Sequence, residues 1–113
     1  MLKKHSRLTK ETIEKHLLRG RRIKTSRFLV LYSVIPGNKL PQVSVTVSKK
    51  TAKLAVTRNK LRRRGYAAAA PLLSGLSPAS IILLSYLSPD IKTPLGELRE
   101  ELKQAFIQAK IYK

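Results

Sequence analysis

The feature that most constrains this sequence is a long central stretch without a carboxylate. From Lys15 to Pro89 there is no Asp or Glu, whereas fifteen Lys and Arg residues fall in that stretch. All six acidic residues lie nearer the two ends, and the chain of 113 residues has a formal charge of +18. Repulsion among so many like charges opposes a compact fold, and a polyanionic partner would relieve it. The sequence therefore predicts a protein that binds a polyanion.

The amino-acid composition narrows the classes of protein to which the chain can belong. With 42% hydrophobic residues, the chain has enough apolar material for one folded domain, expected over residues 1–113 with a flexible basic tail at 1–8. The absence of cysteine excludes disulfides, a thiol nucleophile and a cysteine-ligated zinc site, and His5 and His16 are too few for a histidine cage. No apolar run approaches the length of a membrane span, and no apolar segment follows the basic start as in a secretory signal. We therefore expect a cytoplasmic protein without a membrane partner.

Hydrophobic patterning and turn residues predict the order α-β-β-(β)-α-β-α, in which the brackets allow for one extra short strand, expected near Ile23. Helices are expected over 10–19 and 49–70 and from Pro94 onward, and strands over 28–35, 42–48 and 80–87. Thr9, Ser48 or Thr51, and Thr93 are the expected helix caps. This order is typical of an α+β two-layer sandwich, with helices packed on one face of a mixed sheet.

The second predicted helix is strongly basic. Eight of its first sixteen residues, from Lys49 to Arg64, are Lys or Arg, with no acid among them. Like charges four positions apart, such as Arg58 and Arg62, destabilise a helix by a few tenths of a kcal/mol per pair (~0.2–0.5). Bound phosphate would remove this cost. The ordinary alternative is a solvated helix face without a partner, which the one-signed charge beside the hydroxyl-bearing strand 42–48 disfavours.

Two motifs in this region carry a resemblance. Ser48-Lys49-Lys50 is followed by Arg58-Asn59-Lys60-Leu61-Arg62-Arg63, and further matches lie at 7–10, 19–22, 28–32 and 98–102. In order and spacing these segments resemble the protein subunit of bacterial ribonuclease P over nearly the whole chain. The resemblance implies the ribosomal protein S5 domain 2-like fold, with a left-handed β-α-β crossover.

The resemblance also implies a function. Members of this family assist a catalytic RNA, which holds the active site and its Mg²⁺ ions and removes the 5′ leader of precursor tRNA. The expected partners are therefore the ribonuclease P RNA and precursor tRNA, with no small-molecule substrate, no catalytic residue and no metal or cofactor held by the protein itself. The residues expected to contact the catalytic RNA are Lys49, Lys50, Lys53, Arg58, Asn59, Lys60, Arg62 and Arg63. Those expected to wall a cleft for the leader are Ile13, Leu17, Phe28, Tyr32, Ser44 and Thr46.

The chain departs from the family pattern at three places. Lys60 replaces an arginine, and Ile13 and Leu17 stand where aromatic residues are common. After the motif the chain has Arg64-Gly65-Tyr66-Ala67, where the family usually continues with Leu, Arg and Glu. Aliphatic side chains cannot stack on leader bases as rings do. The main alternative function is a basic ribosomal or general RNA-binding structural protein. An independent two-metal nuclease is disfavoured, because the central stretch has no carboxylates to hold the ions.

Overall fold

The structure is a computed structural model that describes residues 20–37 and 39–112. Its elements follow the predicted order, including the short strand near Ile23; the helix predicted over 10–19 lies outside the described residues. The strands are β1 (Arg21–Lys24), β2 (Phe28–Val34), β3 (Gln42–Thr46) and β4 (Ser80–Tyr86). The helices are α2 (Ala55–Ala69), the 3₁₀ helix η3 (Ala70–Gly75) and α3 (Leu95–Gln108).

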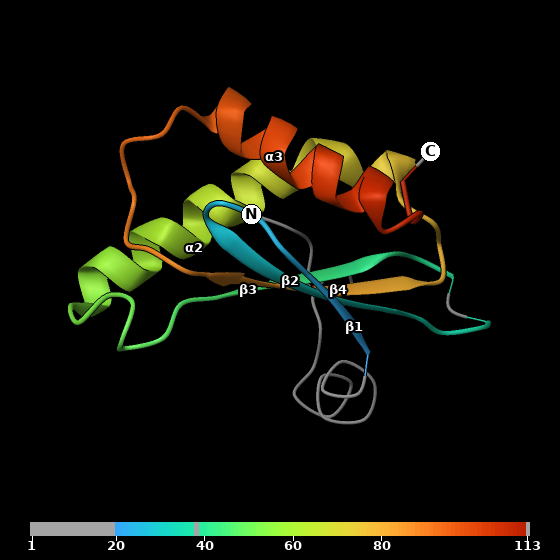
Figure 1. Cartoon of the computed structure of the whole chain (residues 1–113), viewed down its shortest axis with the longest axis horizontal. Coiled ribbons are helices and arrows are strands. Elements are labelled where there is room, and N and C mark those ends of the chain that lie inside the picture. Colours follow the sequence, from blue (N-terminus) through green and yellow to red (C-terminus); the bar gives the residue numbers. More distant parts are fainter. Residues whose placement is uncertain (1–19, 38, 113) are drawn as a thin grey trace.

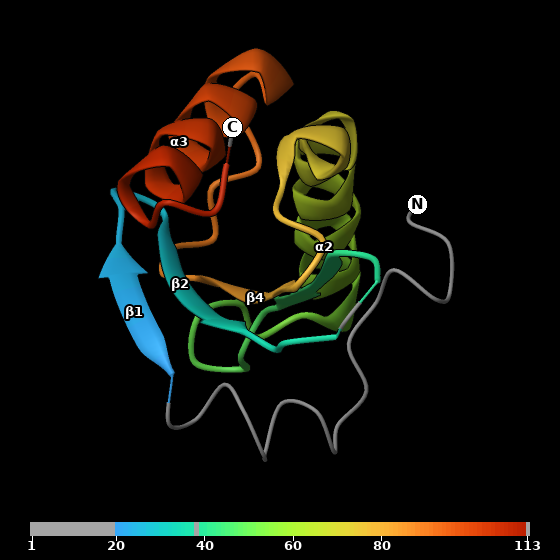
Figure 2. The same cartoon turned by 90° about the vertical axis from the view of Figure 1, so that its right-hand side faces the viewer.

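The four strands form one mixed sheet in the order β1-β2-β4-β3. Strand β3 pairs with β4 in parallel, and the other two pairs are antiparallel. Helices α2 and α3 lie on the same face of the sheet (Figure 1), and the turned view shows both of them above it (Figure 2). The predicted α+β class with a mixed sheet is therefore confirmed, while the S5-like label and the hand of the crossover stay predictions.

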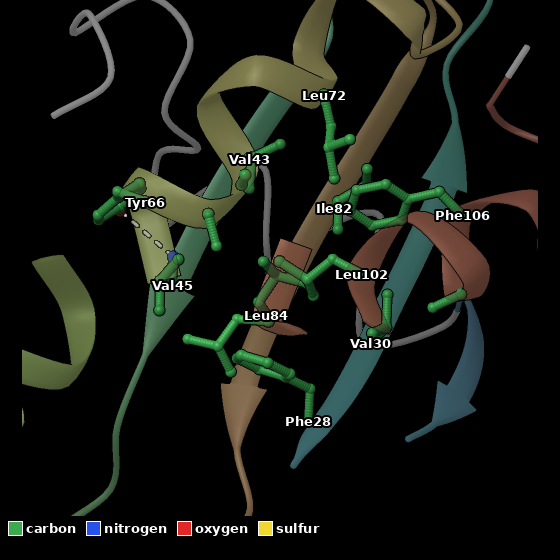
Figure 3. Close-up of a cluster of buried hydrophobic side chains, with 14 of the residues drawn as sticks. Phe28, Val30, Val43, Val45, Tyr66, Leu72, Ile82, Leu84, Leu102 and Phe106 are labelled. Carbon is green, nitrogen blue, oxygen red and sulfur yellow. Dashed lines mark hydrogen bonds between the residues drawn. The ribbon is translucent and has the colours of Figure 1, made fainter. Parts of the chain in front are cut away.

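The hydrophobic core fills the space between the sheet and the two helices. Strand β2 contributes Phe28 and Val30, which are fully buried, and α3 contributes Leu102 and Phe106. Figure 3 shows Phe28 beside Leu84 of the central strand β4, and Phe106 beside Ile82 of the same strand. Because side chains alternate along a strand, every second residue of β2, β3 and β4 enters this core. The alternate residues lie on the face of the sheet away from α2 and α3, which we call the far face.

Two local predictions about helix starts were wrong. Helix α2 begins at Ala55 instead of Lys49, because the chain first makes a turn in which the Thr51 N–H donates to Ser48 Oγ at 3.1 Å. Helix α3 begins after Pro94, and Thr93 does not cap it. The Thr93 hydroxyl donates instead to the Asp90 carboxylate, which also accepts the Thr93 N–H at 3.2 Å. In both places a short polar side chain bonds within its own turn, as Ser, Thr and Asp readily do.

Gly65 brings α2 close to the sheet. A Cβ atom at this position would lie 2.8 Å from Cγ1 of Val45 on β3 and 3.4 Å from the Tyr86 ring on β4. Any larger residue would have to displace one of these buried side chains. Gly65 therefore sets the distance between α2 and the sheet.

Candidate nucleic-acid interface

The outward side of α2 is polar and basic. Leu61, Gly65 and Ala68 face the core, whereas Asn59, Lys60 and Arg63 are exposed on the opposite side. Residues three and four apart lie on one side of a helix, so these side chains form a continuous stripe. This places three of the predicted RNA-contacting residues on one surface.

The turn before α2 extends this surface. The Ala52 N–H donates to the Ser48 carbonyl at 3.1 Å, and the Thr51 hydroxyl donates to the Tyr86 carbonyl at 3.3 Å. These bonds hold the turn against the end of β4. They leave exposed Lys49, Lys50 and Lys53. We call these three residues, together with Asn59, Lys60 and Arg63, the basic surface.

Arg58 and Arg62 have partners within the protein. Arg58 Nη1 donates to the carbonyls of Ala52 at 3.0 Å and Lys53 at 2.8 Å, and its side chain is half-buried. Arg58 therefore fixes the turn to the start of α2. Arg62 donates to Oδ1 of Asn59, one helical turn earlier. Arg62 is thus oriented beside the basic surface by a neutral partner that leaves its charge uncompensated.

Arg64 differs from the neighbouring cations. It donates to the Thr93 carbonyl before α3, so it joins the two helices. Its Nε and the Tyr86 hydroxyl are buried without a hydrogen-bond partner, and burial raises the pKa of Tyr86 to about 12. Arg99 on α3 forms a second contact between the two helices by donating to the Ala68 carbonyl at 3.3 Å. These residues stabilise the packing of α2, which supports the basic surface.

Three of the four carboxylates of the described residues lie around Arg27. Arg27 Nη1 contacts Glu101 at 2.5 Å, its Nε contacts Asp90 at 3.3 Å, and its Nη2 lies 3.9 Å from Glu97. Hydrogen bonds from the Thr93 hydroxyl, and then from the Lys92 N–H, hold the pKa of Asp90 well below its usual range. The acids therefore tie the β1–β2 turn to α3 and leave the basic surface uncompensated.

The far face of the sheet carries hydroxyl groups. Ser44 and Thr46 of β3 lie there, opposite Leu83 and Ser85 of β4. The Thr46 and Ser85 hydroxyls lie 3.0 Å apart. Beside them, Ile81 and Leu83 form a second small hydrophobic cluster with Leu31 and Ile35. Ile81 and Leu83 are 0% and 7% exposed, so this face offers hydrogen bonds from its hydroxyls more than apolar contact.

Comparison with known proteins gives the family. A model of the ribonuclease P family matches residues 2–110. The chain belongs to the ribonuclease P protein family. It is 32% identical to the ribonuclease P protein component of Clavibacter michiganensis over 110 residues, which cover 96% of each chain. It is also 36% identical to that of a Pseudanabaena species over 70 residues, covering 62% of this chain and 60% of that protein.

Solved structures of the ribonuclease P family share the fold. The Staphylococcus aureus RNase P protein superposes with a TM-score of 0.75 at 21% identity, covering 96% of this chain and 98% of that one. The Thermotoga maritima RNase P protein gives a TM-score of 0.73 at 18% identity, covering 90% and 96%. The described strands and helices therefore share the fold of these ribonuclease P proteins.

One part of the predicted leader cleft was wrong. Phe28 and Tyr32 are 0% and 8% exposed and point into the core beneath the helices, whereas Ser44 and Thr46 lie on the opposite face. The four residues therefore cannot line one wall. Ile13 and Leu17 lie outside the described residues.

Sequence reasoning also missed several far-face residues. Because Phe28, Val30 and Tyr32 face the core, their neighbours Leu31 and Ser33 must face away. Pairing with β2 then places Arg22 and Lys24 of β1 on the far face as well. Strict alternation along β2 was the available signal for these positions.

Neither a metal site nor a membrane helix is present in the described parts of the chain. Within residues 20–37 and 39–112, no three His, Asp or Glu side chains come together as a possible metal site. No helix in these same ranges is long and apolar enough to cross a bilayer.

Proposed function

We propose that this chain is the protein subunit of ribonuclease P. In this proposal the basic surface binds the catalytic RNA, and the far face binds the 5′ leader of precursor tRNA. The RNA, with its own Mg²⁺ ions, hydrolyses the phosphodiester bond. The observation that carries the proposal is the basic surface itself, which displays five cations and no described carboxylate on a chain of this family.

Physical chemistry supports this division of roles. Each lysine or arginine that neutralises a phosphate releases condensed counterions, which favours binding most at low salt. The neutral Asn59 among these cations can donate and accept hydrogen bonds on RNA. The far face lies on the other side of the sheet from the helices, so it can receive a second strand while the basic surface is occupied.

Reconstitution with ribonuclease P RNA tests the function. At low Mg²⁺ concentration the protein should increase the rate of precursor tRNA cleavage, and the increase should depend on the presence of a leader. Tight RNA binding without stimulation would instead favour a general RNA-binding structural protein, the alternative considered above.

A substitution that removes one positive charge tests the basic surface. Arg63→Ala should weaken binding to the catalytic RNA and reduce the slope of log affinity against log salt by about 0.9 for a phosphate contact on duplex-like RNA. Lys39→Ala removes the same charge from an exposed position in the β2–β3 connection, at the other end of the sheet from the turn before α2. This control should leave the slope unchanged. Equal slopes for the two variants would contradict the assignment of Arg63.

A further inference from the structure

The arrangement of the aromatic residues bears on how the far face binds a strand. The chain contains two Phe, four Tyr and no Trp, and all six rings belong to described residues. Phe28, Tyr32, Tyr66, Tyr86 and Phe106 are buried in the main core, and Tyr112 packs against it. No Phe, Tyr or Trp ring is therefore available on the far face.

Two of these rings have contacts that hold them away from the far face. The Tyr66 hydroxyl accepts the Val45 N–H at 3.2 Å along the free edge of β3 (Figure 3). The Tyr112 ring lies so close to Gly75 that an added Cβ would approach it to 2.5 Å. Moving either ring to the far face would break these contacts and open the core.

The far face itself offers groups suited to a ribose-phosphate backbone. Ser44, Thr46 and Ser85 supply hydroxyls that donate to phosphate oxygens or pair with a ribose 2′-hydroxyl. Along the β1 edge of the same face, Arg22 and Lys24 are exposed and supply positive charge. All four carboxylates of the described residues lie elsewhere, in α3 and the segment before it.

From this arrangement we infer that the far face holds single-stranded RNA through its ribose-phosphate backbone, without stacking bases on aromatic side chains. The inference rests on the proposed function and adds how the leader is recognised. Binding of the leader by this protein is insensitive to base identity and depends on phosphate charge. Sites that stack bases gain roughly fivefold or more in affinity per base. That gain is missing here.

The test measures the binding of four RNAs to the reconstituted holoenzyme: three precursor tRNAs, each made uncleavable by a 2′-deoxy substitution at the scission site, and tRNA without a leader. One has an intact leader, one lacks the leader, one has an abasic leader that keeps ribose and phosphate, and one has a leader with neutral methylphosphonate linkages. The abasic leader should bind within about threefold of the intact one. The methylphosphonate leader should bind as weakly as leaderless tRNA.

Other results would overturn the inference in distinguishable ways. A loss of fivefold or more with the abasic leader would show that bases stack, whether on the Arg22 guanidinium or on His16, which lies outside the described residues. Equal affinity for intact and leaderless tRNA would overturn the leader contact in the proposed function, and base-independence with it.

Adding an aromatic ring to the far face by substitution gives a second test. Leu31→Tyr places a ring on the far face, and Val34→Tyr places one on the opposite side of the same strand, at a position that is 53% exposed. Leu31→Tyr should make the holoenzyme prefer the intact leader over the abasic one by about fivefold or more. Val34→Tyr should not. If both folded variants treat the two leaders alike, the strand does not lie on β2 and the inference is wrong.

Discussion

Replacing Gly65 with alanine should destabilise the protein, although alanine is the better helix former. The new Cβ would lie 2.8 Å from Cγ1 and 3.2 Å from Cγ2 of Val45, which is only 3% exposed. Overpacking of this kind costs about 1–3 kcal/mol, and the gain in helix propensity returns about 1 kcal/mol. The free energy of unfolding should therefore fall by roughly 0–2 kcal/mol.

A second substitution tests this reasoning more strictly, because it should reverse the sign of the effect of Gly65→Ala on the free energy of unfolding. Val45→Ala removes both methyl groups that the new Cβ would meet, and by itself it should cost about 2 kcal/mol. In the Val45→Ala protein, Gly65→Ala should then stabilise by about 1 kcal/mol, since only the propensity gain remains. The coupling between the two sites should be about 1–3 kcal/mol.

Urea unfolding followed by circular dichroism measures all four proteins. Gly96→Ala in the first turn of α3 is the matched control, because nothing lies within 4 Å of its added Cβ. It should stabilise by up to about 1 kcal/mol. If Gly65→Ala stabilises the otherwise unchanged protein as much as Gly96→Ala does, α2 does not approach β3 as closely as argued.

Three further substitutions test the supports of the site. Tyr66→Phe leaves the buried Val45 N–H without its acceptor and should lower the free energy of unfolding by about 1–3 kcal/mol in urea titrations; an unchanged midpoint would contradict this role. Arg27→Ala should cost roughly 1.5–3 kcal/mol, because it removes the charged partner of Glu101, whose side chain is 14% exposed. Asp90 has a lowered pKa in the folded state, so its contribution is present above about pH 4 and is lost as the pH falls below it. Asp90→Asn should flatten the acid limb of the stability profile, and an unchanged limb would refute the assignment.

Local patterns predicted most of the fold. Strict alternation of Val43 and Val45 with Ser44 and Thr46 gave β3 its limits to within two residues, and the turn at Pro36-Gly37 ended β2. Gly37 adopts a φ of 89°, which suits glycine alone. The sheet order and the parallel pairing of β3 with β4 come from contacts far apart in the sequence. Alternation and propensity carry no information about those contacts.

The errors in the candidate site have a common physical origin. Helix propensity predicted that α2 would begin at Lys49, but the Ser48 side chain satisfied the Thr51 N–H in a turn and delayed the helix. The resemblance placed Arg58 among the RNA contacts, which stays a prediction, but it did not show that Arg58 Nη1 also donates to two carbonyls before the helix. Composition shows which groups are present, whereas their partners depend on backbone groups that only the folded chain brings near.

The partners that each charged side chain finds also explain the distribution of charge. Every salt bridge among the described residues involves Arg27, which takes Asp90, Glu97 and Glu101 as partners. Those acids hold the start of β2 against α3 and stabilise the sheet from which the far face is built. The cations of the basic surface are left without carboxylate partners in this part of the chain, and their mutual repulsion is a cost to the free protein. Binding phosphate converts that cost into affinity, because the repulsion that opposes folding is removed by the ligand.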